Sequence, residues 1–185
     1  LPGDLGRSLW TSFDFDKKAN ALKKGGIKDF SCPKPLVDND PKAVLSYSVW
    51  VPSKYDARKS YPMILLVPDK DQKPAQHINE KWTDAAIRDE AILVAVSMPE
   101  DTATWTEPAA RLDDGKVKDG GISNVLAVLV DARKLVAVDF DRVYLCGTGE
   151  GVRAACATAA RFPDNFAGVA GRSGDVPDKL AIEPF

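Results

Sequence analysis

Short runs of apolar residues, separated by stretches with helical periodicity, constrain the fold of this chain more than any other feature. Residues 63–67 and 91–96 are wholly apolar, and residues 142–146 and 166–170 are predicted as two further buried strands. Each is too short for a typical helix, and an uninterrupted apolar strand is typical of a parallel sheet that is covered on both faces. Residues 43–51 instead alternate between apolar and polar side chains, which predicts a half-exposed strand.

Segments with helical spacing lie between the runs. Residues 74–90 are predicted as one helix from the spacing of Ile78, Trp82, Ala85 and Ala86. Residues 122–138 form a strongly amphipathic pattern, and residues 152–161 an alanine-rich one. The inward positions predicted for the 122–138 helix are Val125, Leu126, Leu129, Val130 and Val136. Strands alternating with such helices form βαβ units, so the predicted fold class is α/β, a three-layer α/β/α sandwich around a mainly parallel sheet.

The length fits a single domain, and the composition argues against two classes of partner. A chain of 185 residues suits one domain with its own core. Residues 1–42 are predicted as an N-terminal extension and loop, with three prolines in 31–42, and residues 43–185 as the domain. A net charge of −2 argues against a nucleic-acid partner, and apolar runs no longer than about eight residues argue against a membrane-spanning segment.

The compartment stays open. The first residue is Leu1 rather than Met. A soluble protein that is secreted or periplasmic after leader removal fits this start, and so does a fragment.

A tight glycine-rich turn follows the predicted strand at 142–146 and precedes the alanine-rich helix. Its residues are Gly147, Thr148, Gly149, Glu150 and Gly151. A strand, a Gly-x-x-x-Gly turn and a small-residue helix resemble the nucleophile elbow of the α/β-hydrolases, Gly-x-Ser-x-Gly. Residues 161–174, Arg-Phe-Pro-Asp-Asn-Phe-Ala-Gly-Val-Ala-Gly-Arg-Ser-Gly, resemble the segment after the elbow in the esterase and polyhydroxyalkanoate-depolymerase-like branch.

The turn departs from that family at each catalytic position. Gly149 stands where the family has its nucleophilic serine, and glycine has no side chain that could attack a carbonyl. The family places its histidine after the elbow, but the single histidine of this chain, His77, comes before it. The resemblance therefore implies a degenerate elbow, and no residue of this chain is assigned as catalytic.

The resemblance also implies a missing part of the sheet. The sheet of that family continues with two strands beyond the position of 166–170, and only 15 residues follow here. The fold is thus predicted as α/β-hydrolase-like and lacking its last strands. An apolar strand at 166–170 would be an open edge, so we expect a second copy, a partner chain or residues 176–185 to cover it.

Three further side chains are candidates for ligand binding beside Gly149 and Glu150. Asp69 follows the strand at 63–67, His77 opens the next predicted helix, and Trp105 lies in the long loop 99–121. Each also has a plainer interpretation: a solvated loop carboxylate, a helix-packing histidine and a loop anchor. Glu150 is interpreted as a charge at a helix N-terminus, and Thr148 as pointing away from the nucleophile position.

No cofactor or metal is predicted. A dinucleotide motif would need a third glycine at Val152, and Asp69 with Asp71 lacks the residues around it that a magnesium phosphotransferase requires. The favoured function is a non-catalytic α/β-hydrolase-fold protein with a binding or structural role. The alternative is a carboxylic ester hydrolase whose acid and histidine lie outside this chain.

Overall fold

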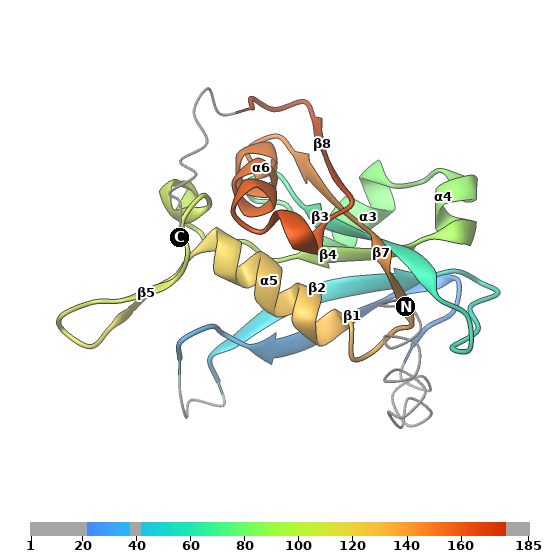
Figure 1. The fold of residues 1–185 in the computed structure, drawn as a ribbon, viewed down its shortest axis with the longest axis horizontal. Helices are drawn as coiled ribbons and strands as arrows, with labels where there is room; N and C mark the ends of the chain where they lie inside the picture. Colours follow the sequence, from blue (N-terminus) through green and yellow to red (C-terminus); the bar gives the residue numbers. More distant parts are fainter. Residues whose placement is uncertain (1–21, 38–41, 177–185) are drawn as a thin grey trace.

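The computed structural model describes residues 22–37 and 42–176, which form one six-stranded sheet with helices on both faces (Figure 1). The strand order is β1-β2-β4-β3-β7-β8. These strands are β1 (Gly26–Pro33), β2 (Val44–Val51), β3 (Tyr61–Val67), β4 (Ile92–Val96), β7 (Val138–Thr148) and β8 (Gly168–Arg172). The main helices are α3 (Pro74–Lys81), α4 (Ala85–Glu90), α5 (Gly121–Ala132) and α6 (Gly151–Arg161).

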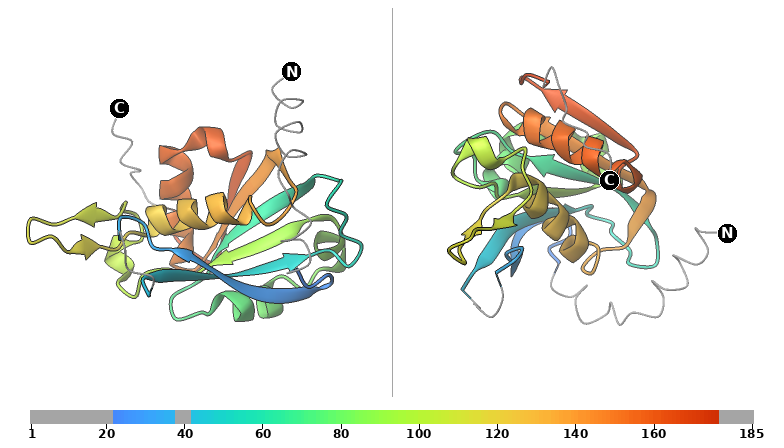
Figure 2. Two further views of the ribbon diagram at one scale, coloured as in Figure 1. Left: turned by 90° about the horizontal axis from the view of Figure 1, so that it is seen from below. Right: turned by 60° about the vertical axis from the view of Figure 1, so that its left-hand side comes forward.

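The sheet is mainly parallel, as predicted. Strands β4, β3, β7 and β8 run parallel to one another, whereas β2 pairs antiparallel with both β1 and β4. Helices α5 and α6 cover one face, and α3 and α4 cover the other (Figure 2). The three-layer α/β/α prediction is therefore confirmed.

The central strands divide their side chains between two cores. Leu65 of β3 packs into the larger core with α5 and α6, and the next residue, Leu66, packs into the smaller core with Ile78 of α3. Successive strand side chains point to opposite faces, so an all-apolar strand serves both layers. Every residue of β4 is buried for the same reason.

The N-terminal part of the sheet starts earlier than the sequence predicted. The expectation of a loop over 31–42 is wrong for residues 31–33, which belong to β1, and β1 pairs with β2 along its whole length. Pro33 is tolerated because it ends an edge strand, where its missing N–H costs no ladder hydrogen bond.

The helix predicted over 74–90 is divided in two. Helix α3 ends at Lys81, and α4 begins at Ala85 after Asp84, whose carboxylate accepts from the Ile87 backbone N–H at 3.1 Å. The periodicity continued through this break because Ile78 and Trp82 both face the smaller core. Ala85 and Ala86, however, are exposed.

The helix predicted over 122–138 ends early. Helix α5 stops at Ala132, and Val136 and Val138 are buried as part of the turn into β7 and the strand itself. Val130, predicted to face inward, is 53% exposed, because the buried stripe of α5 runs through Val125, Val128 and Leu129 instead. A hairpin, β5 (Ala110–Arg111) and β6 (Val117–Lys118), and two short 3₁₀ turns, Thr102–Thr104 and Pro163–Asn165, complete the fold.

Strand β8 is not buried, in contrast to the prediction for 166–170. It lies at the edge of the sheet, and Val169 is 46% exposed. No strand of the described residues pairs with its outer side. That a partner or the chain's own tail covers this edge stays a prediction.

The break before α4 generates a test. Asp84→Ala removes the side chain that caps α4, and we expect the free energy of unfolding to fall by about 1 kcal/mol. Asp89→Ala in the same helix removes an equal charge without removing a cap, and should cost clearly less. Urea unfolding of both variants checks this, and equal losses would contradict the capping role.

Candidate functional site

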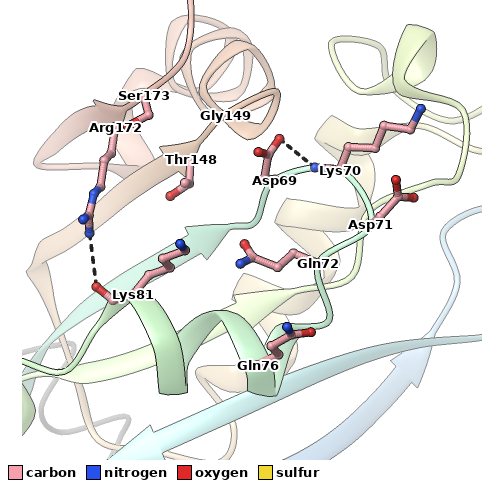
Figure 3. A pocket seen from close by; sticks show the side chains of 10 residues that line it. All are labelled: Asp69, Lys70, Asp71, Gln72, Gln76, Lys81, Thr148, Gly149, Arg172 and Ser173. Carbon is pink, nitrogen blue, oxygen red and sulfur yellow. Dashed lines mark hydrogen bonds between the residues drawn. The ribbon is translucent and has the colours of Figure 1, made fainter.

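A polar cleft of about 320 Å³ lies at the carboxyl ends of β3, β7 and β8 (Figure 3). It is lined by Asp69, Lys70, Asp71, Gln72, Gln76, Lys81, Thr148, Gly149, Arg172 and Ser173. The chain leaves β3 toward α3 on one face and leaves β7 toward α6 on the other. Adjacent parallel strands whose connections diverge in this way open a crevice at their carboxyl ends.

The predicted turn forms one wall of this cleft. Strand β7 ends at Thr148, α6 begins at Gly151, and Gly149 between them has φ +55°, a conformation that favours glycine. The Gly149 N–H donates to the Arg172 carbonyl at 3.0 Å, which joins the turn to the end of β8. A Cβ on Gly151 would overlap the Val67 carbonyl, so the small residue also lets α6 approach β3.

The carboxylate of Asp69 fills the space in front of Gly149. Its Oδ1 accepts from the Glu150 backbone N–H at 2.9 Å and from the Lys70 backbone N–H at 2.8 Å. A Cβ built on Gly149 would overlap this carboxyl group. Asp69 and Glu150 lie 81 positions apart in the sequence, and the structure brings them together.

Two other residues of the turn were also assigned roles from the sequence. Thr148 was expected to point away from the nucleophile position, but it is buried and lines the cleft. Glu150 was interpreted as a charge at the start of α6. Its side chain makes no capping bond and lies 4.0 Å from Arg153, while its backbone N–H makes the contact with Asp69.

His77 lies beneath the cleft rather than in it, with a fully buried side chain. The indole N–H of Trp82 can only donate, and it donates to His77 Nε2 at 3.3 Å. His77 Nδ1 therefore carries the proton and donates to Gln72 Oε1 at 2.7 Å. Both ring nitrogens are thus engaged, as expected for a helix-packing histidine.

The surroundings keep His77 neutral. Burial lowers its pKa to about 4, and the positive charges of Lys81 and Arg172 contribute in the same direction, against a smaller opposite effect of Asp69 and Glu80. A neutral imidazole with both nitrogens bonded cannot accept a proton without losing the bond from Trp82.

Trp105 does not line the cleft. It is buried, and its indole N–H donates to the Pro99 carbonyl at 2.7 Å, so it anchors the loop 99–121 to the domain. Within residues 22–37 and 42–176, no three His, Cys, Asp or Glu side chains gather in a way that could hold a metal ion. No helix in these ranges is long and apolar enough to span a membrane.

Several cleft residues were not singled out from the sequence. Gln72, Arg172 and Ser173 lie in the segments 68–73 and 171–175, which follow predicted strands, and a site in a parallel sheet is expected at these carboxyl ends. Lys81 carried no such signal. Lys81 reaches the cleft because α3 ends there, where the Arg172 Nη1 donates to the Lys81 carbonyl at 3.3 Å.

Solved structures with the same fold are α/β-hydrolases. An S-formylglutathione hydrolase from Agrobacterium tumefaciens superposes with a TM-score of 0.62 at 16% identity, over 81% of this chain and 58% of that one. A ferulic acid esterase has a TM-score of 0.62 at 15% identity, over 85% and 62%. An acetyl xylan esterase from Aspergillus awamori has a TM-score of 0.60 at 15% identity, over 82% and 53%.

These likenesses establish the fold alone. The protein has an α/β-hydrolase fold, as the elbow-like turn predicted, and it spans between half and two thirds of the length of these three chains. No model of a known protein family matches the sequence. No curated protein matches it either.

The buried histidine generates a pH prediction. The folded state holds the His77 pKa near 4, below the value of about 6.5 in an unfolded chain, so the unfolded chain takes up the proton first as the pH falls. We expect this side chain alone to lower the free energy of unfolding by about 2 kcal/mol between pH 7 and pH 5. Urea unfolding at both pH values measures it.

His77→Gln supplies the control, because glutamine does not titrate and the chain has no other histidine. Between pH 7 and pH 5, the free energy of unfolding should fall by about 2 kcal/mol less in the variant than in the wild type. Equal pH dependence in the two proteins would show that His77 is not held neutral.

Proposed function

We propose that this chain is a non-catalytic α/β-hydrolase-fold protein, that residues 147–151 are a degenerate nucleophile elbow, and that the cleft beside them is a binding site. The position of Gly149 supports this. It stands at the vertex of a strand–turn–helix bend with φ +55°, where an active member of the fold presents its attacking hydroxyl.

The contact of Asp69 with two backbone N–H groups carries the proposal. Acyl transfer on this fold places the oxyanion against the N–H of the residue after the nucleophile and an N–H from the loop after the third strand. Here the corresponding donors, Glu150 N–H and Lys70 N–H, both bind the Asp69 carboxylate. An anion that belongs to the protein thus occupies the place where a reaction intermediate would develop its charge.

The only histidine cannot replace the missing base. His77 is fully buried on α3, its two nitrogens bind Gln72 and Trp82, and its pKa lies near 4. General-base catalysis needs a group that can reach the nucleophile and accept its proton near neutral pH. His77 meets neither condition in this arrangement.

An ester hydrolase is the second candidate, with its acid and histidine outside this chain. The likeness to esterase structures that are longer than this chain favours it. It requires a nucleophile other than Gly149. The candidate is Thr148, which carries the hydroxyl of the same turn and lines the cleft. It also requires Asp69 to leave the two N–H groups, which costs charge-assisted hydrogen bonds.

Substitutions at Gly149 test the proposal. We expect Gly149→Ser to show no more turnover of p-nitrophenyl acetate than wild type and no labelling by a fluorophosphonate. The variant should lose about 1–3 kcal/mol of unfolding free energy, because residue 149 would be strained at positive φ and would overlap Asp69. The double variant Asp69→Ala/Gly149→Ser removes the overlap and keeps the test valid if the single variant does not fold.

The wild-type protein distinguishes the two candidates. Turnover with covalent labelling of the wild type would end the non-catalytic proposal, and loss of that labelling in Thr148→Val would assign the nucleophile. Turnover in the double variant alone would contradict the argument that no base is available, and it would leave the wild type non-catalytic with a degenerate elbow. Ser46→Ala, on β2 away from the cleft, is the matched control.

A further inference from the structure

Two cations from different elements meet at the cleft. Lys81 ends α3, Arg172 ends β8, and Figure 3 shows both lining the same side of the cavity. Arg172 donates to the Lys81 carbonyl at 3.3 Å, which uses one of its five N–H groups. Within the described part of the chain, neither side chain forms an ion pair. Two positive charges thus face a shared space without a carboxylate between them.

The acidic residues of the cleft do not neutralise this pair. Asp69 is held by the Lys70 and Glu150 backbone N–H groups at the start of α6, where the helix dipole also favours a negative charge. Asp71 and the Lys70 amino group are turned away from Lys81 and Arg172 (Figure 3). The charge that remains inside the cleft is positive.

The uncharged wall of the cleft presents hydrogen-bond donors. The indole of Trp82 fixes the proton of His77 on Nδ1, which occupies the oxygen of Gln72. The donors of that amide, its Nε2 hydrogens, are left for the cleft. The indole N–H of Trp82 can only donate, so the direction of donation from Trp82 to His77 and from His77 to Gln72 stays fixed while His77 is neutral.

Hydroxyl groups complete the wall on the opposite side. Thr148 and Ser173 both line the cavity. Ser173 has φ +56°, a conformation that costs a residue with a side chain about 1–3 kcal/mol and that is concentrated at binding and catalytic sites.

We propose that this cleft binds a small molecule through its carboxylate or phosphate group, with Lys81 and Arg172 supplying the positive charge and Gln72, Thr148 and Ser173 the neutral donors. Guanidinium geometry matches both kinds of anion. A volume of about 320 Å³ admits a small ligand. The inference rests on the proposed binding role and adds the chemical class of its ligand.

The electrostatics of His77 support this assignment. After burial, the charges of Lys81 and Arg172 are the largest causes of its low pKa. The buried imidazole therefore lies in the positive electrostatic potential of the same two side chains that would attract an anion into the cleft. Since His77 is the only histidine of the chain, its ring nitrogens report on the cleft without overlap from another residue.

The test is a titration of the full ¹⁵N-labelled chain with sodium phosphate and, separately, with sodium acetate, each against sodium chloride at equal ionic strength. We expect saturable shifts of the His77 ring nitrogens and of the Gly149 and Ser173 amides, and an upward shift of the His77 pKa. Saturation by phosphate alone would assign a phosphate group, and saturation by acetate alone a carboxylate.

Variants locate the binding. Lys81→Gln and Arg172→Gln should each weaken the binding at least about tenfold. Lys59→Gln removes an equal charge from the turn before β3, at the other end of the sheet, and should leave the affinity unchanged. Shifts no different from those with chloride, or affinities unaltered in both cleft variants, would overturn the inference. Heat denaturation of each variant confirms that it is folded.

The outcomes separate this inference from the proposed function. Hydrolysis of p-nitrophenyl acetate by the wild type would end the non-catalytic proposal whatever the titration shows. Absence of hydrolysis together with absence of anion binding would overturn only the ligand class.

Discussion

The bond between the Asp69 carboxylate and the Glu150 backbone N–H is the contact on which the functional interpretation of this fold depends. It joins the loop after β3 to the turn after β7, two segments that the sheet places side by side. The carboxylate needs the space that Gly149 leaves free, and a side chain at that position would exclude it. The absence of a side chain at residue 149 and the position of the Asp69 carboxylate are therefore parts of one packing arrangement.

That arrangement also determines the character of the cleft. Asp69 is drawn into the turn, so its charge is satisfied by backbone donors rather than by the cations nearby. Lys81 and Arg172 keep their charges directed at the cavity and lower the pKa of the histidine beneath it. The cleft presents positive charge and hydrogen-bond donors, which is the basis of our proposal that it binds an anion.

Local sequence patterns predicted the strands well and the element boundaries less well. The apolar runs at β3 and β4 were recognisable because a strand buried on both faces has no polar positions. The division of helix 74–90 was missed because Trp82, in the break, still packs into the core and continues the periodicity. Strand β8 was predicted as buried because its composition is apolar, although an edge position leaves Val169 exposed.

The sequence by itself determined that the turn at 147–151 has no hydroxyl at its centre and that a single histidine precedes it, since both are matters of residue identity. It also determined the α/β class, because strand and helix periods are local properties. Only the tertiary structure decided that Asp69 reaches the turn, that Arg172 meets Lys81 and that Trp82 orients His77. The first two contacts join residues 81 and 91 positions apart, and the order of the strands brings them together.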